Sequence, residues 1–316
     1  MIGVFGSDEV ARSAFLSSVG KKSEAEGIVV YHRTEGGRRV SFLDTSDYPG
    51  RIQGFARIAS LSDHAYYLFP RTGTLSVPDG ELAVLLTAAG VGGTLEILDG
   101  SSTSDMARAA LKGTAVADFS VDERSTLSTV IDLSRVAERR DRPPGGTLIY
   151  VDRVFSVKGV GTVALGFVLS GSVSVHDKLR PVPGTEGLRL DVRGVQINDQ
   201  DFESAGRGIR VGLSLRGAEA KELEKTRWLD DGSFALSNDA IMDFEKSSFY
   251  RPTIEGRDLH LQLPGELVTA RLEATAEGLR AKLPISSPVW DGMRVVVLDL
   301  NGKGLRVAGG ATLKMR

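Results

Sequence analysis

One short segment, VAERRDRPPGG at residues 136–146, separates two parts of the chain that differ in their hydrophobic pattern. Before it, strand-like apolar runs alternate with helix-like stretches, as in MIGVF followed by SDEVARSAFLSSV. After it, the apolar runs are short and strand-like, and turn residues separate them. Because charge followed by Pro-Pro-Gly-Gly ends a helix, we expect a linker at 137–146.

The alternating part, residues 1–136, predicts an α/β domain whose mostly parallel sheet is covered on both faces. A turn signal at 34–37 lies between two apolar runs and predicts a hairpin that adds an antiparallel edge strand. This predicted α/β domain should end with a helix at 104–111, a strand near 113–119 and a helix at 124–136.

The first predicted helix begins with a capping residue and carries an apolar stripe. Ser7 is the expected N-cap. The apolar stripe should consist of Val10, Phe15, Leu16 and Val19.

Many short strands at close spacing predict two successive all-β domains after the linker, at 147–229 and 230–316. Each is expected to be a small barrel. The predicted fold class is therefore one α/β domain followed by two small β-barrels.

Composition excludes several classes of function. The 316 residues are 41% hydrophobic and 25% charged, with a formal net charge of -2 that indicates no nucleic-acid or membrane partner by itself. The absence of cysteine excludes disulfides and thiolate metal sites. The histidines are too scattered for a metal site, no apolar run approaches the ~20 residues that cross a bilayer, and Asp8 and Glu9 argue against a signal peptide. We expect a cytoplasmic protein that binds neither membrane nor DNA.

The first strand and helix contain half of a phosphate-binding loop. On the pattern Gly-x-x-x-x-Gly-Lys-Ser/Thr, Gly6 and Ser13 match, whereas Ala11 replaces the second glycine and Arg12 the lysine. Ala11 adds a Cβ where a phosphate approaches closely, and the planar fork of Arg12 is a poor substitute for a point donor. Asp8 and Glu9 should make the helix start unfavourable for a bound phosphate.

The run VDRVFSVKGVGTVALGFVLSGSVSVHDKLRPVP after the linker resembles the second domain of the translational GTPases, the family of elongation factor Tu and, more closely, the selenocysteine-specific elongation factor. The matching residues are Arg153, Phe155, Gly159, Gly161, Thr162, Val163, Gly166, Val168, Gly171, Asp177 and Leu179. The segment DGMRVVVLDLNGKGLRVAGGATL is similar to the end of the family's last domain. Thr226 and Arg227 depart from the family's usual Gly-Asp. The resemblance implies a P-loop-NTPase-like G domain followed by two barrels.

The resemblance also implies where a nucleotide would bind, and each part of that site is altered. Ser13 and Asp44 match the magnesium positions, but Gly50 comes late after Asp44 and no histidine follows it. Asp99, Gly100 and Ser102 stand where the family reads guanine with Asn-Lys-x-Asp, so the bidentate acceptor is lost. The first switch segment has essentially no room. We expect a pseudo-GTPase domain that is not an enzyme and binds neither GTP nor magnesium tightly.

The barrels of the resembled family contact tRNA and the ribosome, which implies that this chain binds RNA, either tRNA or rRNA, or a translation-machinery protein. The candidate RNA contacts are the basic residues Arg294, Lys303, Arg306, Lys314 and Arg316. Two alternatives stay open. One is a protein-interaction scaffold, and the other is a divergent GTP-binding hydrolase that uses Arg12, Ser13 and Asp44.

Overall fold

The computed structural model describes residues 1–23, 27–35, 38–98, 102–124, 141, 143 and 145–315. The predicted helix at 124–136, apart from Arg124 at the end of a strand, and most of the predicted linker lie outside these residues. The chain divides into two compact units, which are described separately below. Unit 1 consists of Met1–Arg140, Asp243–Leu279 and Arg294–Thr312, and unit 2 of Asp141–Met242, Arg280–Met293 and Leu313–Arg316.

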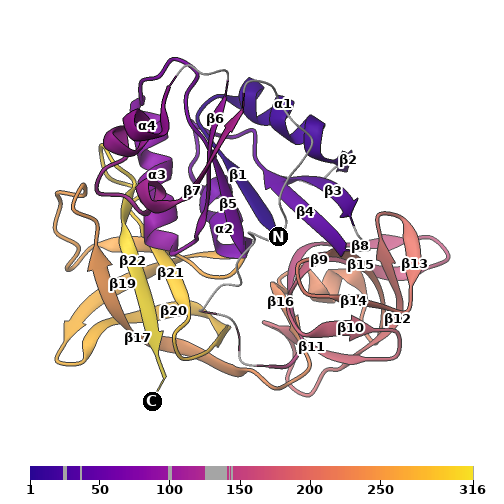
Figure 1. The fold of residues 1–316 in the computed structure, drawn as a ribbon. Coiled ribbons are helices and arrows are strands. Elements are labelled where there is room, and N and C mark those ends of the chain that lie inside the picture. Colours follow the sequence, from indigo (N-terminus) through magenta and orange to yellow (C-terminus); the bar gives the residue numbers. More distant parts are fainter. Residues whose placement is uncertain are drawn as a thin grey trace. The chain divides into compact units, whose positions relative to one another are not determined.

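A seven-stranded mixed sheet forms the first part of unit 1, with strand order β2-β3-β4-β1-β5-β6-β7 (Figure 1). Its strands are β1 Ile2–Phe5, β2 Lys21–Ser23, β3 Val29–Glu35, β4 Arg38–Asp44, β5 His64–Leu68, β6 Gly93–Leu98 and β7 Ser120–Arg124. β1 pairs in parallel with β4 and β5, whereas β3 and β4 form an antiparallel hairpin. All four residues of β1 are buried, as expected for a central strand covered on both faces. The predicted α/β sheet with an antiparallel edge is confirmed.

The helices of this sheet domain are α1 Glu9–Val19, α2 Gln53–Leu61, α3 Val77–Ala89 and α4 Ser104–Ala110. A short 3-10 helix, Ala115–Asp118, lies before β7. The predicted strand near 113–119 is therefore wrong, because the strand begins one residue beyond it, at Ser120.

Helix α1 differs from its prediction at two residues. Its N-cap is Asp8 rather than Ser7, because the Asp8 carboxylate accepts the Ala11 N–H at 3.1 Å. Val10 is 79% exposed and does not belong to the buried stripe, which instead begins with Ala11 and Arg12. Phe15, Leu16 and Val19 are buried as predicted.

The β-domain of unit 2 is a sheet of order β11-β16-β8-β9-β15-β12-β13, and an additional pairing of β11 with β12 closes it. Its strands are β8 Leu148–Val157, β9 Gly161–Ser170, β11 Lys178–Val182, β12 Leu190–Ile197, β13 Gln200–Phe202, β15 Arg210–Arg216 and β16 Trp228–Asp230. A separate pair is formed by β10 Ser172–Ser174 and β14 Ser204–Gly206. Alternate strand residues fill one apolar core, as the pattern of β12 shows.

The last six strands form a closed barrel of order β17-β20-β19-β18-β21-β22. They are β17 Ala235–Lys246, β18 Asp258–Gln262, β19 Leu267–Thr275, β20 Gly278–Val289, β21 Arg294–Leu298 and β22 Val307–Lys314. The predicted fold class, an α/β domain followed by two β-domains, is confirmed. Within the described part of the chain, no helix is long and apolar enough to cross a membrane.

Candidate functional site

The candidate site lies at the carboxyl ends of the parallel strands, the edge where open α/β sheets bind ligands. β1 ends at Phe5 and leads through Gly6 into α1, while β4 ends at Asp44. A Cβ at Gly6 would meet the Leu68 carbonyl oxygen at 3.3 Å, so the loop packs closely on the end of β5.

Arg12 is completely buried in this loop. Its Nε donates to Asp44 Oδ1 at 2.8 Å, Nη1 donates to the Gly6 carbonyl at 2.6 Å, and Nη2 donates to the Thr45 carbonyl at 2.9 Å. The guanidinium lies 5.1 Å from the centroid of the Phe55 ring. Each guanidinium nitrogen thus has an acceptor within the protein. The positive charge of Arg12 therefore stabilises the loop and the end of β4 instead of facing outward toward a phosphate.

The two predicted magnesium positions are not equivalent in the structure. Asp44 is buried and ion-paired with Arg12 at 2.8 Å, whereas Ser13 lies on the exposed side of α1. Burial raises the pKa of Asp44, and the charge and hydrogen bond of Arg12 partly offset this rise. A metal at Asp44 would have to displace a guanidinium, so these residues do not fit magnesium.

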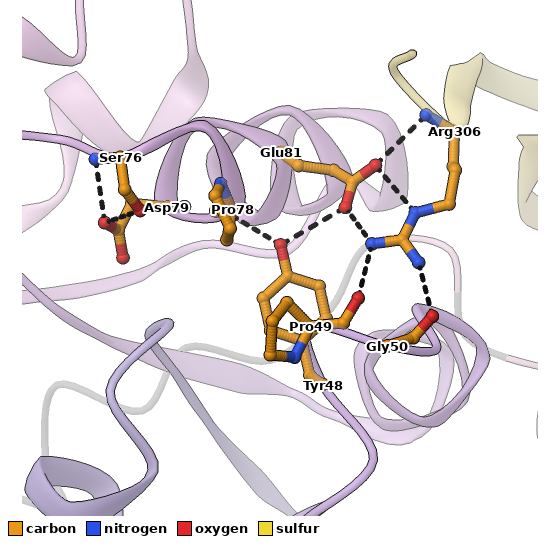
Figure 2. A network of polar contacts seen from close by, with 8 residues as sticks. All are labelled: Tyr48, Pro49, Gly50, Ser76, Pro78, Asp79, Glu81 and Arg306. Carbon is orange, nitrogen blue, oxygen red and sulfur yellow. Dashed lines mark hydrogen bonds and ion pairs between the residues drawn. The ribbon is translucent and has the colours of Figure 1, made fainter. Parts of the chain in front are cut away.

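A residue that the sequence did not suggest, Asp79, occupies the anion-binding side of the loop. Its Oδ1 accepts the Ser7 backbone N–H at 3.1 Å. Its Oδ2 accepts the Ser76 backbone N–H at 3.0 Å and the Ser76 hydroxyl at 2.6 Å (Figure 2). The bond from the Ser76 backbone completes the capping box at the start of α3. The loop amide after Gly6, of the kind that binds phosphate in a phosphate loop, therefore donates to a carboxylate.

This arrangement corrects the role expected for the acidic start of α1. The Asp8 carboxylate caps its own helix, and Glu9 is exposed. The carboxylate that takes up the loop amide comes from α3 instead. The capping pattern Ser76-x-x-Asp79 is readable in the sequence, but its contact with Ser7 is not.

Residues 48–50, which include the predicted Gly50, are held by Arg306 (Figure 2). Arg306 Nη1 donates to the Gly50 carbonyl and Nη2 to the Pro49 carbonyl, both at 3.1 Å. Glu81 Oε1 accepts the Arg306 backbone N–H at 3.1 Å and Nε at 3.0 Å. The Tyr48 hydroxyl donates to the Pro78 carbonyl at 2.6 Å and to Glu81 Oε2 at 3.2 Å. Burial raises the pKa of Tyr48, so its hydroxyl keeps the proton that it donates.

The candidate RNA contacts fall into three groups. Arg306 is engaged as just described, and Arg294 donates to the Ala88 carbonyl at 2.9 Å, to Thr312 Oγ1 at 3.2 Å and to Glu245 Oε2 at 2.7 Å. Lys303 and Lys314 are exposed, and Arg316 lies outside the described residues. Arg294 and Arg306 are therefore used in contacts within unit 1, and this part of the predicted RNA surface is weakened.

The predicted guanine-reading positions are described only in part. Asp99 and Gly100 lie outside the described residues. Ser102 is 7% exposed, and its buried hydroxyl has no hydrogen-bond partner within the described part of the chain. A serine hydroxyl cannot supply the two acceptor atoms of an aspartate.

No protein-family model matches the sequence. An uncharacterized protein from Methanocaldococcus jannaschii is 28% identical over 312 residues, which cover 98% of this chain and 97% of that protein. The selenocysteine-specific elongation factor from Escherichia coli is 29% identical over 175 residues, 54% of this chain and 28% of that protein. The crystal structure of a bacterial selenocysteine-specific elongation factor aligns with a TM-score of 0.79 at 17% identity. That alignment covers 99% of this chain and 57% of the other chain.

Proposed function

We propose that this chain, a homologue of the selenocysteine-specific elongation factors with the fold of a translational GTPase, is a translation-factor-like protein that has no GTP switch. It binds RNA, either tRNA or rRNA, or a protein of the translation machinery through its β-domains. It is not an enzyme, and neither GTP nor magnesium binds tightly.

The burial of Arg12 carries the proposal. A phosphate entering the loop would meet a guanidinium whose nitrogens already donate to Asp44, Gly6 and Thr45. It would also meet the Asp79 carboxylate at the Ser7 amide. Like charges repel, and the ion pair of Arg12 with Asp44 would have to break before the cation could face a ligand. Nucleotide binding would therefore break the ion pair of Arg12 with Asp44 and the hydrogen bond of Ser7 with Asp79.

The homology supports the translational part of the proposal. Several relatives that align with part of this chain are by name elongation factors, as is the solved structure that aligns with nearly all of it. The described strands form two β-domains, as the family resemblance implied, and Lys303 is exposed on the C-terminal part. Because exposed cations bind phosphate backbones without sequence selection, RNA is a partner that Lys303 fits.

A filter-binding titration of the chain with total tRNA and with rRNA tests both parts of the proposal. We expect saturable binding that weakens as salt increases, with the same affinity in the absence of nucleotide, with GTP and magnesium, and with GDP and magnesium. Lack of saturable binding to either RNA would remove the RNA part. An affinity that depends on the nucleotide would remove the claim that the switch is lost.

The engagement of Arg294 and Arg306 within unit 1 favours a second candidate, a protein-interaction scaffold. In that case the chain would capture the same protein partners before and after RNase treatment. Partners that are lost on RNase treatment would favour RNA binding instead.

A further inference from the structure

Arg306 connects two segments of the sheet domain to the hairpin between β21 and β22 in unit 1. The first is residues 48–50, whose Pro49 and Gly50 carbonyls accept its guanidinium N–H groups. The second is α3, through Glu81 (Figure 2). The Glu81 side chain is 7% exposed and that of Arg306 is 22% exposed, so this pair is shielded from water much more than a surface ion pair.

The far end of α3 is held by the same pair of strands. Arg294 of β21 donates from Nε to the Ala88 carbonyl in the last turn of the helix at 2.9 Å. Gly310 of β22 approaches so closely that a Cβ there would meet the Ala88 carbonyl oxygen at 2.2 Å. The two ends of α3 are therefore both attached to β21 and β22.

Helix α2 is attached at both ends as well. Residues 48–50 precede its first turn, and Arg306 holds them. Near its last turn, the Ser60 hydroxyl accepts the Gly265 backbone N–H at 3.0 Å. Gly265 belongs to the turn between β18 and β19 of the barrel.

Hydrogen bonds and an ion pair of Asp299 hold the hairpin that carries Arg306. The Asp299 backbone N–H donates to the Arg306 carbonyl at 2.8 Å. The Asp299 carboxylate accepts the Tyr250 hydroxyl at 2.6 Å and lies 2.9 Å from Arg257 Nη1. Because these contacts fix the backbone at Arg306, little backbone conformational entropy is lost when its side chain binds residues 48–50.

We propose that Arg306 is a permanent clasp, which holds residues 48–50 and α3 against β21 and β22 in one arrangement whether or not nucleotide is present. Residues 48–50 follow Asp44, which matches a magnesium position of the resembled family, and they include Gly50, the glycine that comes late after it. Any rearrangement of this segment would leave the buried Glu81 carboxylate and two backbone carbonyls without their partner. This inference rests on the proposed function, because a chain without a nucleotide switch has no need to release this segment.

Hydrogen exchange measured by mass spectrometry on the 316-residue chain tests the clasp. Arg306→Lys keeps the charge but cannot reproduce the fork that reaches Glu81, Pro49 and Gly50 together. We expect exchange in residues 45–61 and 76–90 to become about tenfold faster in this variant. Glu81→Gln keeps the shape and removes the charge, and should accelerate the same two segments.

Arg280→Lys is the matched control. Arg280 also donates from two guanidinium nitrogens to a carboxylate, that of Asp239, but this pair lies in unit 2 and is 43% and 36% exposed. This control should leave both segments unchanged.

Equal exchange in Arg306→Lys and wild type would overturn the clasp. It would also be overturned if GTP with magnesium changed the exchange of residues 45–61 in the wild type. Parallel calorimetry separates the two ideas. If calorimetry detects no nucleotide binding and Arg306→Lys has no effect on exchange, the clasp alone fails. If nucleotide binding is detected, the proposed loss of the switch fails.

Discussion

At the scale of single residues, Arg12 stands at the lysine position of the phosphate-loop pattern and pairs with acceptors of its own loop and of the end of β4. A lysine carries a point charge at the end of a flexible stem, whereas an arginine presents a planar fork with five donors. The loop supplies acceptors in three directions, from Asp44, Gly6 and Thr45, and the fork matches them. In the phosphate-loop motif the positive charge at this position binds phosphate, whereas the Arg12 guanidinium binds acceptors within the protein.

Removal of Arg12 should destabilise the fold strongly. Arg12→Ala leaves the Asp44 carboxylate buried without its partner, which typically costs about 3–5 kcal/mol. Urea unfolding of wild type and variant measures the loss. The double variant Arg12→Met with Asp44→Leu removes both charges and should lose much less stability. A loss in Arg12→Ala no larger than in the double variant would contradict the buried ion pair.

His64 should make the protein sensitive to acid. It is 3% exposed, and burial lowers its pKa from 6.5 to about 4. The unfolded chain therefore binds more protons than the folded chain between these two values, so stability falls as the pH falls from 6.5 towards 4. At 1.36 kcal/mol per pH unit, His64 accounts for up to about 3 kcal/mol of that fall.

His64→Gln isolates this contribution. Glutamine retains a donor for Thr94, whose hydroxyl lies 3.0 Å from His64 Nε2, but does not titrate. Urea unfolding between pH 4 and 7 should show a shallower pH dependence of stability in the variant. Parallel curves for the two proteins would show that His64 is not the group responsible.

At the scale of elements, Asp79 completes the capping box of α3, whose N-cap is Ser76, and also fixes a loop. Its carboxylate accepts from Ser76 at the start of α3 and from Ser7 in the loop before α1. We expect Asp79→Ala to cost about 2 kcal/mol or more, since the loss of a cap alone typically costs about 1 kcal/mol.

Thr103→Ala is the matched control for Asp79. Thr103 accepts the Met106 N–H at the start of α4 as a simple cap. Urea unfolding of both variants compares the loss of a capping interaction that serves one helix with the loss of one whose carboxylate also binds a second loop. Equal losses would mean that the contact between Asp79 and Ser7 contributes nothing to stability.

Sequence pattern predicted the elements well where the signal was local. The run GTLEIL is a strand as expected, and β3 and β4 on either side of residues 36–37 pair as the predicted hairpin, although Thr34 and Glu35 still belong to β3. Ser7 and Asp8 are both good capping residues, so the sequence alone does not choose between them as the cap of α1. Val10 is hydrophobic and fits the spacing of an apolar stripe, but the buried side of α1 contains the charged Arg12 instead.

At the scale of the whole molecule, the site could be predicted only in part, because its defining contacts join distant segments. The mismatched residues Ala11 and Arg12 are visible in the sequence. The bond from Ser7 to Asp79 joins residues 72 positions apart, and that from Arg306 to Glu81 joins residues 225 positions apart. Periodicity and motif spacing contain no information about such pairs, so the sequence cannot show that Arg306 is engaged internally.

Close packing of β22 on α3 in unit 1 predicts a sensitive glycine. Gly310→Ala would place a Cβ 2.2 Å from the Ala88 carbonyl oxygen, a backbone atom that cannot swing away. We expect a loss of about 1–3 kcal/mol, measured by thermal unfolding. Gly206→Ala, also in a strand but with nothing within 4 Å of the added Cβ, is the control. A variant at Gly310 as stable as the one at Gly206 would contradict the close approach.

Isothermal titration calorimetry of the 316-residue chain with GTP and with GDP, each in excess magnesium, tests the central claim most directly. A working translational GTPase in the same buffer provides the positive control. Because the cation of Arg12 and the amide of Ser7 are both engaged internally, the account predicts no saturable heat with nucleotide concentrations up to about 1 mM. Magnesium-dependent binding with a micromolar dissociation constant would contradict it.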